Sequence, residues 1–177
     1  SDADFARVKP LLDAMGTTVY HCGPVGTGGR TKLVNNLLAG INLVGAAEAL
    51  ALAERMGLDG GRTLQVMAAS SAQSWIASDR MHRALAGDWA PRAHMTLLEK
   101  DTGLAQQMAM KAGYVGPLGP GAAAVFAQAS AAGLAELPGS SFMPSLKLLM
   151  PLAMSPISRG KRPAPKRRMT TTTTMAI

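Results

Sequence analysis

The stretch HCGPVGTGGRTKLVNNLLAGINLVGAAEALALAERMGL, residues 21–58, decides the fold of this chain. After its glycine-rich opening, a long helix is predicted from about residue 30 to residue 56, because large apolar side chains recur at helical spacing. These are Leu33, Leu37, Ile41, Val44 and Leu52, and glycine and alanine fill many of the positions between them. A helix that is apolar or small on nearly every side is usually buried. We therefore predict a mainly α-helical bundle.

The composition of the chain supports this fold class. Its 177 residues are 47% hydrophobic and 16% charged, which excludes wholesale disorder and leaves room for one ordinary domain. Aromatic residues make up only 4%, which disfavours a β-sandwich. Cys22 is the single cysteine, so a disulfide framework and a cysteine-based zinc site are both excluded.

Shorter elements are predicted on both sides of the long helix. Helical patterns cover residues 4–15, 59–71, 95–112 and 121–134, a Pro-containing loop covers 87–93, and residues 76–86 fit either a helix or a loop. The β-rich run TTVYHCG, residues 17–23, is predicted as an edge strand. A single strand is not stable alone, so we interpret it as the end of a sheet that lies mostly upstream.

The glycine-rich opening matches neither of two common phosphate-binding motifs. Gly23 and Gly28 have the P-loop spacing, but glycine and arginine occupy positions 29 and 30, where the motif requires its lysine. Gly26 and Gly28 begin a dinucleotide fingerprint, but Thr31 replaces its third glycine.

What remains is a glycine-rich entry to a helix with Lys32 in its first turn. Lys32 and Asn36 are four residues apart and share one helix face, and Gly40 continues that row and is expected to leave room beside them. Free backbone N–H groups, a cation and an amide at a helix N-terminus suit an anionic ligand such as a carboxylate. An ordinary glycine turn with a solvated lysine remains the alternative. A lysine in the first turn opposes the helix dipole, which counts against that alternative.

Two separated blocks carry a resemblance to a known family. The first has the pattern G-x-x-G-x-G-x-x-x-K-x-x-N-N, formed by Gly23, Gly26, Gly28, Lys32, Asn35 and Asn36, and the second is LLEKDTGLA at residues 97–105. Over roughly residues 2–134 the chain resembles the β-hydroxyacid dehydrogenases, which include 3-hydroxyisobutyrate dehydrogenases and 2-hydroxy-3-oxopropionate reductases.

The resemblance implies hydride transfer between NAD or NADP and a small 3-hydroxy acid. Lys32 matches the catalytic lysine, which acts as general acid and base, and Asn36 matches the amide that orients substrate and lysine. Gly26 and Gly28 match the glycines whose backbone approaches the substrate, and Lys100 matches a lysine that contacts the nicotinamide cofactor. No metal is expected, because His82 and His94 stand in no metal-ligand pattern.

The same resemblance implies a domain organisation. Residues 1–23 correspond to the end of a Rossmann domain, and residues 24–134 to a helical substrate and dimerisation domain like the C-terminal bundle of 6-phosphogluconate dehydrogenase. The remaining cofactor domain is missing, so we expect negligible dehydrogenase activity from this chain alone. Residues 135–177 are off the family pattern, rich in proline, basic and threonine residues, and expected to be disordered.

Charge and partners complete the predictions. The net charge of +7 comes almost entirely from residues 135–177, because residues 1–134 contain 11 basic and 10 acidic residues. Nucleic acid is therefore not an expected partner of the body. No secretory signal opens the chain, and its longest uncharged run, residues 112–135, is broken by glycine and proline. We expect a cytoplasmic homo-oligomer without a membrane span. The alternative function is a non-catalytic helical dimerisation module that keeps the signature by descent.

Overall fold

The computed structural model describes residues 1–88 and 95–134, and within them the chain is helical. Its elements are α1 (Asp2–Met15), α2 (Thr27–Arg55), α3 (Gly60–Ala68), α4 (Trp75–Leu85), α5 (Met95–Lys111) and α6 (Gly119–Ala129), followed by a π-helical turn (Ser130–Leu134). The prediction of a mainly helical chain is confirmed, and residues 76–86, for which the sequence left two possibilities, are mostly helical.

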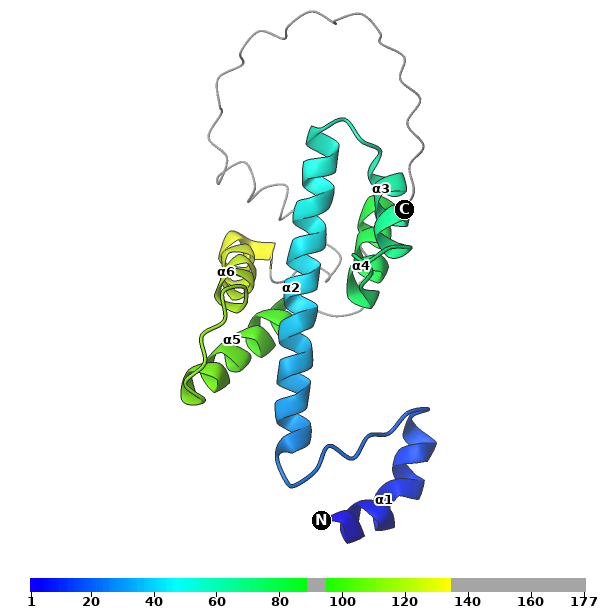
Figure 1. The fold of residues 1–177 in the computed structure, drawn as a ribbon, viewed down its shortest axis with the longest axis vertical. Coiled ribbons are helices and arrows are strands. Elements are labelled where there is room, and N and C mark those ends of the chain that lie inside the picture. The colour runs from blue at the N-terminus through cyan, green and yellow to red at the C-terminus, as the bar shows by residue number, and fades with distance from the viewer. Residues whose placement is uncertain (89–94, 135–177) are drawn as a thin grey trace, which may run out of the picture.

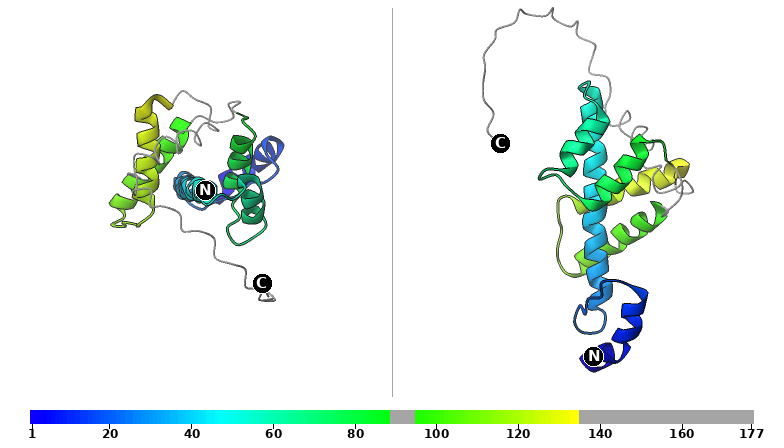
Figure 2. Two further views of the ribbon diagram at one scale, coloured as in Figure 1. Left: turned by 90° about the horizontal axis from the view of Figure 1, so that it is seen from above. Right: turned by 90° about the vertical axis from the view of Figure 1, so that its right-hand side faces the viewer.

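The long helix α2 organises the fold. Figure 1 shows α3 and α4 along one side of α2 and α5 and α6 along the other, while α1 lies beyond its N-terminal end. The view from above in Figure 2 shows α2 end-on between these two helix pairs. The core forms where both pairs meet α2, and it consists of Leu43, Ala46, Ala47, Leu50, Leu64, Ala77, Met81, Phe126 and Ala129. Four of these nine side chains come from α2, which explains its small and apolar composition.

Capping residues set several helix boundaries. The side chains of Ser1, Asp59 and Ser74 each accept a hydrogen bond from the backbone N–H three residues later, which begins α1, α3 and α4. Helix α2 instead has Gly26 as its N-cap, and the φ of 91° at Gly26 lies in the left-handed region that favours glycine. The glycine-rich entry is therefore a turn that redirects the chain into α2.

The predicted strand at residues 17–23 is wrong. No strand occurs in residues 1–88 or 95–134, and this segment runs as an irregular connection between α1 and α2. A strand needs a neighbour to accept its backbone hydrogen bonds, and the described chain supplies none. The segment is held partly by His21, whose ring stacks on Phe5 of α1 with ring centroids 4.4 Å apart.

Several predicted helix ends also differ. Helix α1 begins at Asp2 rather than Asp4, and α2 begins at Thr27 rather than near residue 30, so Lys32 lies in the second turn of α2 and not in the first. Helix α3 ends at Ala68 rather than near residue 71, and α6 begins at Gly119 rather than Gly121. The pattern over 121–134 is not one helix, because α6 ends at Ala129 and Gly133 adopts a φ of 79° in the following turn. The predicted loop 87–93 falls largely outside the described residues, and the expected disordered tail at 135–177 falls wholly outside them.

Gly40 does not leave open space beside Lys32 and Asn36, as its position in the row predicted. Thr102 of α5 and Phe126 of α6 fill that space, so a Cβ on Gly40 would lie 2.8 Å from Thr102 Cγ2 and 3.2 Å from Phe126 Cε2. The missing side chain allows two helices to approach α2 closely, and this approach brings α5 to the functional residues of α2.

By length and composition, α2 could cross a membrane, with a mean hydropathy of 1.5 over its most apolar window. A search for long uncharged runs misses this helix because Lys32 and Glu48 interrupt the apolar sequence. Here α2 is the central helix against which α3 to α6 pack, and the core helix of a folded protein passes the same test. The expectation of no membrane span stays a prediction.

Candidate functional site

One carboxylate joins the two sequence blocks. Lys32 Nζ donates a hydrogen bond of 2.7 Å to Asp101 Oδ2, and Asn36 Nδ2 donates one of 2.6 Å to the same oxygen. Lys32 and Asn36 lie one turn apart on α2, and Asp101 projects from α5. We call these three residues the triad. Asp101 is 69 residues from Lys32 and 65 residues from Asn36 in sequence, and the crossing of α5 over α2 brings them together.

Asp101 is the buried member of the triad. Its side chain is 5% exposed, against 58% for Lys32. The hydrogen bond from Lys32 holds the pKa of Asp101 below its ordinary value, against the effect of burial, and the Asn36 hydrogen bond and the charges of Lys32 and Lys100 add to this lowering. Asp101 is therefore a carboxylate at neutral pH, and it accepts both hydrogen bonds in its charged form.

Asp101 also has an oxygen that its neighbours leave without a hydrogen bond. Within the described part of the chain, Oδ1 is buried and has no hydrogen-bond partner, and Lys100 Nζ lies 3.8 Å away. Lys100 is itself 58% exposed. The site thus presents two exposed ammonium groups around one buried carboxylate.

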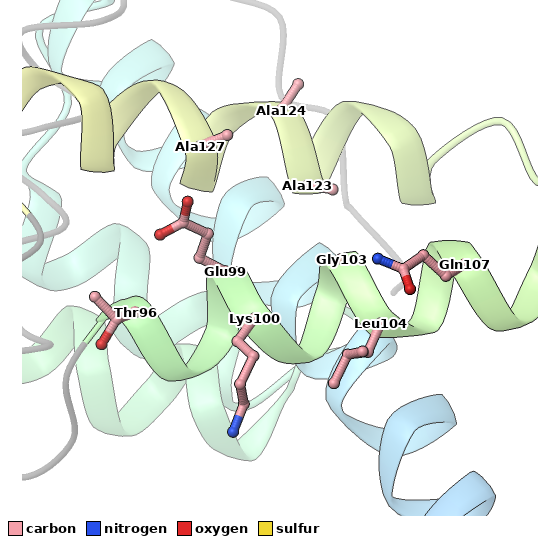
Figure 3. A pocket seen from close by; sticks show the side chains of 9 residues that line it. All are labelled: Thr96, Glu99, Lys100, Gly103, Leu104, Gln107, Ala123, Ala124 and Ala127. Carbon is pink, nitrogen blue, oxygen red and sulfur yellow. The ribbon is translucent and has the colours of Figure 1, made fainter.

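Lys100 precedes Asp101 on α5 and borders a shallow groove between α5 and α6. Figure 3 shows the side chain of Glu99 directed toward α6, whereas Lys100 points away from it. The groove is walled on the α6 side by Ala123, Ala124 and Ala127. The Lys100 amine is therefore available to a ligand on the opposite side of α5 from this groove.

The two glycines lie at the N-terminal end of α2, where Gly28 is one helical turn before Lys32. Gly26 is the N-cap of α2 and Gly28 lies in its exposed first turn. Both line a pocket of about 340 Å³ against α1, which contains neither Lys32 nor Asn36. Of the predicted site residues, Lys32 and Asn36 meet directly through Asp101, Lys100 lies beside them, and Gly26 and Gly28 lie at the helix entry.

A second pocket of about 360 Å³ opens at Asn36 itself. It lies between α2, the α3–α4 connection and the first part of α5, and Trp75 at the start of α4 borders it with 75% of its side chain exposed. Trp75 therefore borders a pocket that shares Asn36 with the triad.

Sequence reasoning also missed the part that Asp101 plays. The residue belongs to the second block, LLEKDTGLA, but its partner cannot be identified from a separation of almost seventy residues. Its position immediately after Lys100 is the one available signal.

Comparison with known proteins gives the family. A family model described as "NAD-binding of NADP-dependent 3-hydroxyisobutyrate dehydrogenase" matches residues 26–144, which extends beyond residue 134, where the sequence predicts the resemblance to end. An L-threonate dehydrogenase of Pectobacterium atrosepticum is 34% identical over 137 residues, which are 77% of this chain and 45% of that protein. The mitochondrial 3-hydroxyisobutyrate dehydrogenase of Bos taurus is 38% identical over 117 residues, covering 61% of this chain and 34% of that one.

Solved structures agree with these relatives. A 3-hydroxyisobutyrate dehydrogenase of Salmonella typhimurium superposes with a TM-score of 0.76 at 34% sequence identity, over 81% of this chain and 51% of that one. The chain spans about half or less of the length of the relatives that it matches. The predicted resemblance to β-hydroxyacid dehydrogenases is confirmed, and the chain belongs to the NAD-binding family of NADP-dependent 3-hydroxyisobutyrate dehydrogenase.

Proposed function

We propose that this chain is the helical half of an NAD(P)-dependent dehydrogenase for small 3-hydroxy acids of the 3-hydroxyisobutyrate or tartronate semialdehyde type. The observation that carries the proposal is the convergence of Lys32 and Asn36 on one buried carboxylate oxygen of Asp101. It joins the residues of two separate family blocks into a single polar centre.

In this function Lys32 transfers the proton. An ammonium group has three N–H donors, and the bond to Asp101 uses one of them, so the others can reach a substrate oxygen. Reduction of a carbonyl needs a proton for the new hydroxyl, which Lys32 donates, and oxidation returns that proton to Lys32. Asp101 holds the ammonium in place, and Asn36 is fixed by the same oxygen beside it.

The cofactor of this reaction is NAD or NADP, which accepts or supplies the hydride when bound. The exposed amine of Lys100 beside the triad suits contact with such a polyanionic molecule. Gly26 and Gly28 expose backbone at the N-terminus of α2, and this supports their proposed approach to the carboxylate end of the substrate.

The packing of the elements supports the proposed domain boundaries. Residues 24–134 hold the bundle, which we assign to the type found at the C-terminus of 6-phosphogluconate dehydrogenase. In α1 no residue is buried, and Val8, Leu11 and Met15 remain exposed, which supports assigning residues 1–23 to the end of a Rossmann domain. Since most cofactor contacts belong to that domain, we expect the 177-residue chain alone to be inactive.

Self-association is part of the proposal. Val34, Leu38 and Leu52 of α2 are each more than half exposed, and their contact with a second copy of the chain would remove them from water. A dimer in sedimentation velocity supports this assignment, and a monomer at all concentrations contradicts it. A cytoplasmic location stays a prediction.

A chimera tests the enzymatic function. The N-terminal half of the L-threonate dehydrogenase from Pectobacterium atrosepticum would be joined ahead of this chain, and formation of reduced nicotinamide would be followed by absorbance with a panel of 3-hydroxy acids. We expect turnover by the chimera and none by the 177-residue chain. Lys32→Ala should lower kcat by about 10²-fold or more, as expected for loss of a general acid–base group.

The matched control for that variant is Lys111→Ala. Lys111 is also an exposed lysine, but it lies in the last turn of α5, away from the triad. A chimera whose turnover is equally insensitive to both substitutions would refute the role of Lys32. Robust turnover by the 177-residue chain alone would refute the expectation that these residues are inactive by themselves.

A further inference from the structure

We draw no further inference here: the strongest candidate, the side-chain cluster at the crossing of α5 over α2 in which the buried Asp101 Oδ1 lies 3.8 Å from Lys100 Nζ, belongs to the candidate site already described.

Discussion

Replacement of Gly40 by alanine tests how the bundle brings the triad together. Gly40 is buried in α2, and the new Cβ would lie 2.8 Å from Thr102 Cγ2 and 3.2 Å from Phe126 Cε2. Thr102 and Phe126 are both fully buried. The Thr102 hydroxyl is also fixed by its hydrogen bond of 2.7 Å to the Leu98 carbonyl, so its methyl group cannot rotate away without losing that bond.

The magnitude follows from two opposing effects. Overpacking of a closely packed core costs about 1–3 kcal/mol. Alanine stabilises a helix by about 1 kcal/mol relative to glycine. The contact of the new Cβ with Thr102 Cγ2 is shorter than real Cβ atoms show, so we expect an overpacking cost in the upper part of that range. After the gain in helix propensity, the net loss in the free energy of unfolding is about 1–2 kcal/mol. Since α5 must move outward, the Lys32–Asp101 bond should weaken too.

Gly45→Ala is the internal control. Gly45 lies on the same helix and is exposed, and a Cβ there would have no atom within 4 Å. It should gain about 0.5–1 kcal/mol from helix propensity alone. Thermal unfolding followed by far-UV circular dichroism should separate the two variants by about 5–10 °C. Equal stabilisation by both substitutions would refute the close contact of α2 with α5 and α6.

Three further predictions concern the triad and the core. Asp101→Asn should lower the free energy of unfolding by about 1–2 kcal/mol in urea titrations, because a charged hydrogen bond is lost but Lys32 is largely exposed; an unchanged midpoint would contradict the pairing. At pH values above 3.8, the ordinary pKa of an aspartate, the lowered pKa of Asp101 stabilises the folded chain. This contribution is lost as the pH falls through the lower pKa of the folded state. Acid titration should therefore destabilise the parent chain more than the Asp101→Asn variant. Equal acid sensitivity of the parent chain and the variant would contradict the lowered pKa of Asp101. Phe126→Ala should cost about 3–5 kcal/mol in the same urea titrations, because the ring is fully buried in the core, and a loss under 1 kcal/mol would show that the site collapses.

Much of the fold could be predicted from local pattern. Residue patterns located most of the helices to within a few residues, because helices depend on hydrogen bonds between near neighbours and on one buried face. The segment that forms α4 was left open between a helix and a loop, and the helix predicted over 121–134 ends at Ala129. The strand at 17–23 failed for the opposite reason. Its residues suit a strand, but a strand exists only with a partner, and residues 1–88 and 95–134 supply none.

The candidate site, too, could be predicted only in part from the sequence. The sequence alone determined that Lys32 and Asn36 share one helix face, because four residues correspond to about one turn of α2. It also determined the family, through two blocks whose order and spacing survive in the linear chain. Only the tertiary structure decided that Asp101 is the residue that both meet, and that Asn36 and Trp75 line one pocket. These contacts depend on the angle and closeness with which α5 and α4 cross α2, and a glycine at position 40 permits the approach of α5 without revealing which residue arrives there.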